Sequence, residues 1–487
     1  GANLSGHING VSRLHGQVAR RMWQTLWPKR YVEEIPISHI TNGVHTCSYL
    51  SRHKNALFER CLPLEWANCL SSPELVSRID QIEDEELWHV HELDRSNLIR
   101  KCRQLLLAQY ERRNAPRNIL DDVSTVLDSK VLTICFARRF ATYKRAGLLT
   151  KDIPRLTRLI TNVEKPIQLV FAGKAHPNDN EGKDIIKKIV EFSRVPDVRH
   201  RVVFLENHDI NIARYMVQGC DVWLNTPRKP NEACGTSGMK ASANGGLNLS
   251  ILDGWWCEGF KENRGWCIGN GDVYNDHEYQ DEVESQALFN VLENEVIPKF
   301  YDRKRSNPPV KWIKMMKEAM KMAIIDFSSD RMVREYSTRF YIPAARNFKL
   351  LTDDSAGKAK ELALTQSRLI SLWSFIELSK PEVTRGIDFI VGDTFRITLK
   401  VFLGELTPEE VEIQIYHGRI RPSGHLEGSR AETMWLQETT GEGKHIYACT
   451  ITCSDPGRFG YTARVIPKGD EVLRNTPGLI TWANGDG

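Results

Sequence analysis

The chain has 487 residues, of which 41% are hydrophobic and 26% are charged, a composition typical of folded proteins that excludes a disordered chain. Its net charge is only +4 and no long basic run occurs, which argues against nucleic acid as a partner. The sequence contains no run of about 18 apolar residues, so we expect no membrane span.

The length is too great for a single core and predicts two or three domains. The eleven cysteines are scattered, odd in number and contain no C-x-x-C pair. This pattern predicts reduced thiols in a cytoplasmic protein and no metal site. The sequence opens at Gly1-Ala2 without a methionine or a signal sequence, so we expect it to begin partway into a larger protein.

A strongly helical stretch at 84–109 comes first, rich in Leu, Arg and Glu and free of Gly and Pro. From residue 131 to 253, short apolar runs alternate with amphipathic helical stretches. The predicted strands are 131–137, 167–172, 201–206, 222–225 and 247–252, and the predicted helices include 153–161 and 185–192. This alternation predicts a parallel sheet wrapped by helices, which binds ligands at the carboxyl ends of its strands.

Two further amphipathic helices, 286–299 and 312–325, are expected to cover the sheet. The composition turns polar around residues 351–355, and a long helix is expected from there to about residue 378. Beyond it, short alternating segments are separated by turns such as Asp455-Pro456-Gly457. The period of two predicts a separate antiparallel β domain of about 100 residues.

The segment 231–240, NEACGTSGMK, lies between the predicted strands 222–225 and 247–252. It places small residues at a helix start, where the peptide N–H groups of residues 235–238 and the helix dipole favour a phosphate. Lys240, one turn further, could form a Schiff base with an aldehyde on the same ligand, as pyridoxal phosphate does. The alternative is a Gly-rich turn followed by a solvated lysine.

The predicted strand 131–137 runs into residues 138–145, RRFATYKR, with four cations in eight positions. Their mutual repulsion is relieved if an anion sits among them, such as inorganic phosphate or a phosphorylated sugar. A solvated basic turn is the alternative. The location at the ligand-binding edge of the sheet favours the anion site.

Together these segments resemble the α-glucan (glycogen/maltodextrin) phosphorylase family, and specifically its short bacterial-type branch without allosteric sites. The matching segments stand in the family's order and are 9–15 (NGVSRLH), 41–44 (TNGV), 139–145, 171–175 (FAGKA), 204–207 (FLEN), 232–240 and Asp253-Gly254. The C-terminal Arg458-Phe459-Gly460-Tyr461 and Trp482-Ala483 resemble the extra domain of that branch.

The resemblance implies an α/β fold of the glycosyltransferase-B type, with a Rossmann-like C-terminal domain, covering helices and a C-terminal antiparallel β domain. Residues 1–45 would be the remnant of the N-terminal glycosyltransferase-B domain and the crossover. Residues 46–350 would form the Rossmann-like catalytic domain that binds pyridoxal phosphate, and residues 351–487 a linker helix with a β-sandwich-like accessory domain.

The implied activity is reversible phosphorolysis of an α-1,4-glucan (glycogen, starch or maltodextrin) by orthophosphate. It would yield glucose 1-phosphate with retention, and the 5′-phosphate of pyridoxal phosphate would act as acid and base. The resemblance makes a homodimer a candidate assembly.

The resemblance also assigns roles. Lys240 would carry the Schiff base, while Arg139 and Lys144 would bind the substrate phosphate. The cofactor would further be held by Thr236, Ser237, Arg138 and His208, the last standing where long-chain members carry a tyrosine. The pocket for the glucosyl unit would be lined by Glu232, Cys234, Gly235, Asn42 and Val11.

Some features depart from the family pattern. Cys234 replaces a usual Ser, and Ser237 replaces a common Gly. The family's glycine-rich phosphate loop and active-site histidine, which belong to its N-terminal domain, have no counterpart in this sequence, so we expect little or no activity from this chain alone.

Two other functions stay open. A nucleotide-sugar glucosyltransferase similar to glycogen synthase would carry a second glutamate where Lys240 stands. A non-catalytic glucan-binding fragment would have no reason to retain Lys240, Arg139 and Lys144 together.

Four tryptophans could either stack on a sugar or pack in the core. Trp255 and Trp256 could form a sugar-stacking platform or pack in the core. In the β domain, Trp435 and Trp482 are expected in the core.

Overall fold

The computed structural model describes residues 2, 5–63, 66, 73–302, 308–383, 390–420 and 426–483. Its contacts divide the chain into two compact units. The α/β unit comprises residues 9–18 and 38–339, and the β unit comprises residues 1–8, 19–37 and 340–487. The domain bounds expected from the sequence, 1–45, 46–350 and 351–487, stay a prediction.

The α/β unit is built on a six-stranded parallel sheet of order β5-β4-β3-β6-β7-β8. Its strands are β3 (Leu132–Ala137), β4 (Ile167–Ala172), β5 (Val202–Leu205), β6 (Val222–Asn225), β7 (Leu247–Ile251) and β8 (Gly265–Ile268). The five predicted strands are confirmed to within a residue at their ends, and the short β8 was not predicted. The order places a topological switch point between β3 and β6, where ligands bind in open α/β sheets.

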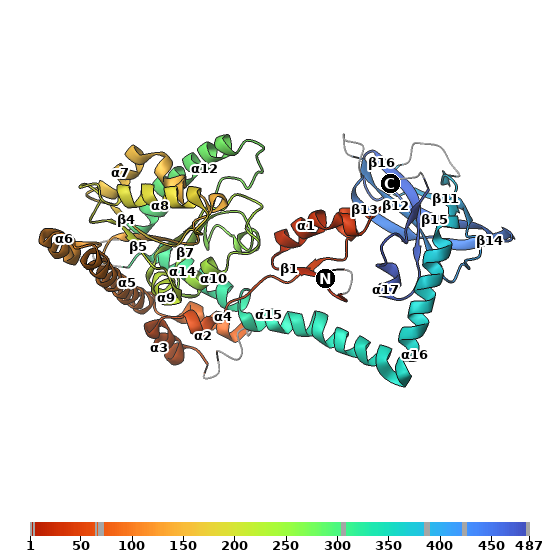
Figure 1. The fold of residues 1–487 in the computed structure, drawn as a ribbon, viewed down its shortest axis with the longest axis horizontal. Helices are drawn as coiled ribbons and strands as arrows, with labels where there is room; N and C mark the ends of the chain where they lie inside the picture. Colours follow the sequence, from red (N-terminus) through yellow and green to blue (C-terminus); the bar gives the residue numbers. More distant parts are fainter. Residues whose placement is uncertain are drawn as a thin grey trace. The chain divides into compact units, whose positions relative to one another are not determined.

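Helices cover both faces of this sheet (Figure 1). Alternate residues of β3 face opposite ways: Ile134 and Phe136 pack with helices α7, α8, α12 and α14, whereas Cys135 and Ala137 pack with α5 and α9. Both sets are almost completely buried, which explains why these strands read as continuous apolar runs.

The helices of this unit are α2 (Thr46–Tyr49), α3 (Arg52–Cys61), α4 (Pro73–Gln81), α5 (Asp84–Arg112), α6 (Arg117–Asp122), α7 (Ile153–Thr161), α8 (Asn180–Phe192), α9 (Ile210–Gly219), α10 (Thr236–Ala243), α11 (Trp256–Gly259), α12 (His277–Val291), α13 (Ile297–Phe300), α14 (Val310–Ile325) and α15 (Ser329–Tyr336). A short parallel pair, β1 (Asn9–Gly10) and β2 (Ser38–His39), precedes them, and α1 (Arg13–Met22) is shared by the two units. Across the described ranges, no helix is both long and apolar enough to cross a membrane.

Two helices begin earlier than predicted because of N-capping side chains. The carboxylate of Asp179 accepts from Gly182 N–H and starts α8, and Asp276 accepts from Glu278 N–H and starts α12. The predicted helix 286–299 is instead the end of α12, a π-helical turn (Leu292–Val296) and α13.

The β unit contains two antiparallel sheets, of order β10-β11-β15-β14, with β9 also paired to β11, and β13-β12-β16-β17. Its elements are α16 (Ile342–Leu372), β9 (Glu377–Leu378), β10 (Glu382–Val383), β11 (Thr394–Phe402), β12 (Val411–Ile420), β13 (Leu426–Thr433), β14 (Trp435–Gly441), β15 (Lys444–Thr452), β16 (Phe459–Pro467), α17 (Glu471–Arg474) and β17 (Thr481–Trp482). One core joins both sheets, with Leu399 and Cys449 from the first packed with Ile413 and Val465 from the second. The predicted antiparallel β domain is confirmed.

The long helix differs from the prediction. It begins at Ile342, is interrupted by non-helical backbone from Asp353 to Ala356, and ends at Leu372. The polar stretch around 351–355 therefore marks a break inside the helix. Residues 377 and 378, expected at its end, form strand β9.

The tryptophans of the β unit have different environments. Trp482 is buried and its ring lies edge-on to Tyr31 and Tyr416. Trp435 is 49% exposed, so its expected place in the core is wrong. It begins β14, the last strand of its sheet, whose residues are all exposed.

Candidate active site

The site begins at the switch point of the parallel sheet. Arg138 directly follows β3, and its Nη1 donates a hydrogen bond to Oδ1 of Asn225, the last residue of β6. Both side chains are buried. The first cation of the loop 138–145 is therefore fixed at the crevice where this sheet is expected to bind a ligand.

The last cation of the loop, Arg145, serves a structural purpose. Its guanidinium donates to the carbonyl oxygens of Thr226 and Pro227 at 3.1 and 2.7 Å. It also forms ion pairs with Asp281, at 2.9 Å, and Glu284. Arg145 is thus compensated by the protein's own carboxylates, and the expectation that a bound anion relieves all four cations is wrong for this one.

Two of the remaining cations lie beside one carboxylate. Nη2 of Arg138 lies 2.5 Å from Oε1 of Glu232, and Nζ of Lys144 lies 3.9 Å from Oε2. Arg139 is exposed. Burial, assisted by Arg138, lowers the pKa of the Lys144 ammonium to about 8, although Glu232 raises it. Arg138 and Lys144 share one carboxylate, and Arg139 adds a further positive charge near Lys144, so this part of the site is positively charged.

Helix α10 starts beside the same carboxylate. Its N-cap residue Gly235 has φ 90° and ψ 62°, a left-handed conformation that favours glycine. A Cβ on Gly235 would lie 3.2 Å from Oε1 of Glu232. In the part of the chain that the structure describes, no side chain caps this helix end, so its dipole is available to an anion. Thr236 and Ser237, both half-buried, form the first turn.

A turn after β7 holds the backbone that carries Glu232. The N–H of Glu232 donates to Oδ2 of Asp253 at 3.0 Å, and the N–H of Trp255 donates to the carbonyl of Cys234 at 2.9 Å. Gly254, at φ 53°, is required there because a Cβ would lie 2.3 Å from that carbonyl oxygen. Burial raises the pKa of the Asp253 carboxyl to about 7, although the N–H groups of Glu232 and Gly254 oppose the shift.

The predicted sugar-binding residues lie together. Asn42 N–H donates to the carbonyl of Val11 at 3.0 Å, and a backbone hydrogen bond links Asn42 to the Cys234 thiol. Burial raises the pKa of Cys234 to about 12, so its thiol stays neutral. Val11 and Cys234 pack in one apolar cluster with Trp255 and Trp256. Both tryptophans are at most 2% exposed, which settles their role as core packing.

Lys240 lies in the second turn of α10 with its Nζ 4.3 Å from the centre of the Tyr49 ring, a cation–π contact. Asn244, which ends α10, holds both partners: its Nδ2 donates to the carbonyls of Lys240 at 3.0 Å and Tyr49 at 2.8 Å. Its Oδ1 accepts from Ser51 N–H at 2.9 Å.

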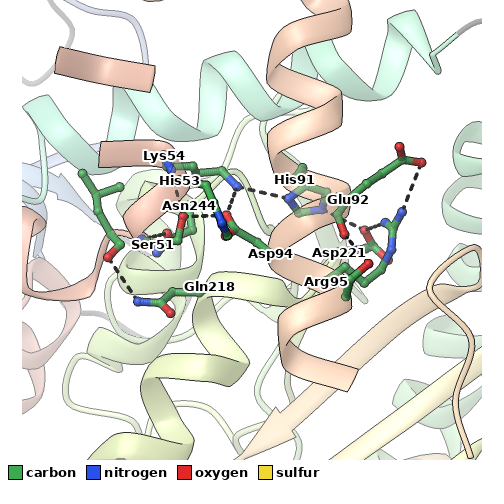
Figure 2. A network of polar contacts seen from close by, with 12 residues as sticks. Ser51, His53, Lys54, His91, Glu92, Asp94, Arg95, Gln218, Asp221 and Asn244 are labelled. Atoms are coloured by element: carbon green, nitrogen blue, oxygen red, sulfur yellow. Dashed lines mark hydrogen bonds and ion pairs between the residues drawn. The ribbon is translucent and has the colours of Figure 1, made fainter. Parts of the chain in front are cut away.

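Through Ser51, the hydrogen bonds of Asn244 connect to a buried ionic network, shown in Figure 2. The hydroxyl of Ser51 donates to Oδ2 of Asp94 at 2.6 Å, and the same oxygen lies 2.9 Å from Nζ of Lys54. Both members of this ion pair are almost completely buried. The C-terminal end of α2, where Tyr49 lies, is therefore tied to helices α3 and α5.

The network continues through His91 to the start of β6. Nε2 of His91 donates to Oδ1 of Asp221 at 2.8 Å, and Nδ1 of His91 accepts from the Lys54 ammonium at 3.4 Å. These two contacts fix the tautomer of His91 with the proton on Nε2. Burial and Lys54 lower the pKa of His91, so the ring is neutral. Arg95 pairs with Asp221 at 2.5 Å. The network thus balances two buried cations with two buried anions.

His208 is the remaining residue predicted to hold the cofactor. It follows β5, Lys174 is among the charges that act on it, and burial lowers its pKa. No hydrogen bond or ion pair joins it to α10 within the described ranges, and its predicted cofactor role stays a prediction. The described residues also contain no group of three His, Cys, Asp or Glu side chains placed to hold a metal ion.

Sequence reasoning missed several residues that position the site. Tyr49, Asn225 and Asn244 are ordinary polar residues in the sequence and belong to no motif of the phosphate loop. Asp253 was noted only as part of a pattern. Their roles depend on contacts between segments far apart in the chain, for which a single sequence gives no signal.

The fold and this site define a protein of the carbohydrate phosphorylase class. The family model for carbohydrate phosphorylase matches residues 2–263, and the model for the glycogen phosphorylase C-terminal domain matches residues 373–484. The chain therefore belongs to the carbohydrate phosphorylase family, and the resemblance inferred from the sequence is confirmed.

Relatives that match nearly the whole chain, or a large part of it, carry the names of this family. The chain is 39% identical over 483 residues to the maltodextrin phosphorylase of Thermococcus litoralis, covering 98% of this chain and 56% of the relative. It is 37% identical over 485 residues to the glycogen phosphorylase of Mycobacterium tuberculosis, covering 99% and 56%. It is 43% identical over 338 residues to the glycogen phosphorylase of Aquifex aeolicus, covering 69% and 48%. The chain spans about half the length of these relatives.

Proposed function

We propose that this chain provides the cofactor- and phosphate-binding part of an α-1,4-glucan phosphorylase. The enzyme would transfer a glucosyl unit from glycogen, starch or maltodextrin to orthophosphate, reversibly and with retention, to give glucose 1-phosphate. The observation that carries this proposal is the convergence of Arg138, Lys144 and Glu232 on the start of α10. The names of the relatives support the choice of glucan and phosphate as substrates.

Pyridoxal phosphate suits these residues. A phosphate is favoured at the uncapped start of α10, where Thr236 and Ser237 offer hydroxyls and Arg138 a buried charge. Lys240 lies one turn further along the helix and would hold the aldehyde end. When bound, the cofactor supplies a phosphate that can exchange a proton with the substrate phosphate. His208 remains a candidate for a contact with the cofactor.

The substrate phosphate would bind Arg139 and Lys144. Arg139 is exposed and carries a permanent charge, while Lys144, with a pKa of about 8, is mostly protonated at neutral pH. Two phosphates in proximity need such cationic compensation.

The glucosyl unit would lie against the cluster that joins Val11, Asn42, Cys234 and Gly235. The Glu232 carboxylate would accept a hydrogen bond from a sugar hydroxyl and so orient the unit. The neutral thiol of Cys234 adds no charge beside it. Binding in a fixed orientation, with water excluded, is the contribution we assign to these residues.

Covalent labelling tests the proposal. After incubation with pyridoxal phosphate and reduction with borohydride, peptide mapping should find a pyridoxyl group on Lys240. Lys240→Arg keeps the positive charge beside Tyr49 but should lose the label while retaining its thermal stability. A label on another lysine, or none on the unmodified chain, would contradict the proposal.

A further inference from the structure

The carboxylate of Glu232 occupies the position that an anionic ligand would take. It contacts the buried Arg138 at 2.5 Å and approaches Lys144 to 3.9 Å, and Glu232 itself is 7% exposed. Its Oε2 is buried and accepts no hydrogen bond from the described residues. A buried carboxylate oxygen is costly to leave without a hydrogen bond.

The same carboxylate also lies at the start of α10. The close approach of its Oε1 to the Cβ direction of Gly235 places a negative charge at the positive end of the helix dipole. A phosphate would be stabilised by the same three elements: the helix start, Arg138 and Lys144. Glu232 and a phosphate group therefore compete for one electrostatic environment.

The backbone of Glu232 is fixed independently of its side chain. Its N–H is held by Asp253, and the following turn is held by the hydrogen bond from Trp255 to Cys234. The side chain has three rotatable bonds and is restrained by its charge contacts with Arg138 and Lys144. An arriving anion can take over those contacts while the backbone stays in place.

We infer that Glu232 is an internal counter-ion, which neutralises the phosphate-binding cations in the ligand-free chain and is displaced when a phosphate-bearing ligand binds. This inference rests on the proposed function and deepens it. Once displaced, the carboxylate is free to accept a hydrogen bond from a sugar hydroxyl. Phosphate binding and sugar binding are then coupled, and the coupling is reciprocal by thermodynamic linkage.

Binding of two related aldehydes by the full 487-residue chain tests the inference. Glu232→Gln keeps the shape of the side chain but removes the competing charge. It should bind pyridoxal phosphate about tenfold more tightly than the unmodified chain. Pyridoxal, which lacks the phosphate, should bind both chains equally. Asp122→Asn, which breaks a surface pair with Arg199, should change neither affinity.

Each outcome is decisive. Weaker or equal binding of pyridoxal phosphate by a folded Glu232→Gln chain, with Lys240 still labelled, would overturn the counter-ion role and leave the proposed function intact. Equal tightening for pyridoxal would also overturn it, because the effect would not involve the phosphate. Failure of the unmodified chain to bind pyridoxal phosphate would overturn both.

A second variant keeps the test valid should Glu232→Gln not fold. Glu232→Asp is one methylene shorter and withdraws the carboxylate from Arg138. It should tighten pyridoxal phosphate binding in the same direction by a smaller factor, and unchanged or weaker binding would overturn the inference.

Discussion

The two ends of helix α10 differ in how completely their buried charges are paired. At its C-terminal end, Asn244 leads to a network in which Lys54, Asp94 and Asp221 are buried and paired with one another or with further buried groups. At its N-terminal end, Arg138 and Lys144 share a single carboxylate that keeps an oxygen without a hydrogen bond among the described residues.

This difference separates support from function. A buried charge network stabilises a structure only when its members are satisfied, and partial satisfaction is costly. The network at the C-terminal end pairs two buried cations with two buried carboxylates, leaving only Nη2 of Arg95 without a hydrogen bond among its described members, and it holds Tyr49 beside Lys240. At the N-terminal end two cations share one carboxylate, and this excess of positive charge is the property expected of a site that takes up an external anion.

Removing one member of the network should have the largest effect. Asp94→Ala leaves the Lys54 ammonium buried without its carboxylate and should lower the free energy of unfolding by about 3–5 kcal/mol. Urea denaturation followed by tryptophan fluorescence measures it. Asp122→Ala, which removes a pair exposed by about 40% on both sides, should cost no more than about 1 kcal/mol.

The pH dependence of this effect has a definite sign. Burial alone would raise the pKa of Asp94, but Lys54 and the hydrogen bonds from Ser51 and His53 lower it overall. The stabilisation by Asp94 is therefore full above its unfolded pKa of about 3.8 and is lost as the pH falls further. A similar cost for Asp94→Ala and Asp122→Ala at neutral pH would contradict the contrast drawn between the network and surface pairs.

The sequence predicted the strands and the N-terminal start of α10, but few of the contacts that join segments far apart in the chain. The strands were visible as apolar runs because both faces of the sheet are covered. The phosphate-binding start of α10 was visible because its residues are adjacent in the chain. The pair of Arg138 with Glu232 joins positions far apart, and no local pattern shows that a protein carboxylate would lie among those cations.

Neighbouring residues of one motif also have unrelated roles. Lys144 and Arg145 are adjacent cations, yet Lys144 borders the site while Arg145 points to Asp281 and Glu284. The left-handed backbone of Arg145, at φ 43°, turns the chain between them. The positive charges in the sequence could not distinguish the roles of Lys144 and Arg145, because the carboxylates that bind Arg145 come from a helix far away in the chain.

Substitutions in the phosphate site should have an intermediate effect, on binding and not on stability. Arg139→Ala and Lys144→Ala should each weaken orthophosphate binding to the cofactor-loaded chain by roughly ten- to a hundredfold, the loss of one charge-assisted contact. Titration calorimetry measures this, with Arg199→Ala as the control for loss of a surface cation. If both variants lose the cofactor and keep their phosphate affinity, the division of roles within the loop is wrong.

The smallest expected effect is a pH dependence carried by Lys144 alone. Burial lowers the pKa of Lys144 to about 8, so its ammonium loses a proton as the pH rises through that value. Above that pH an anion binds more weakly, because Lys144 must be protonated again for the charged contact to form. Sulfate is a suitable probe, since its own charge stays constant over this range. Its affinity should fall about fourfold from pH 7 to pH 8.5. Lys144→Arg, whose guanidinium stays protonated, should show no such decline. An equal decline in both chains would assign the titration to another group and leave Lys144 charged throughout.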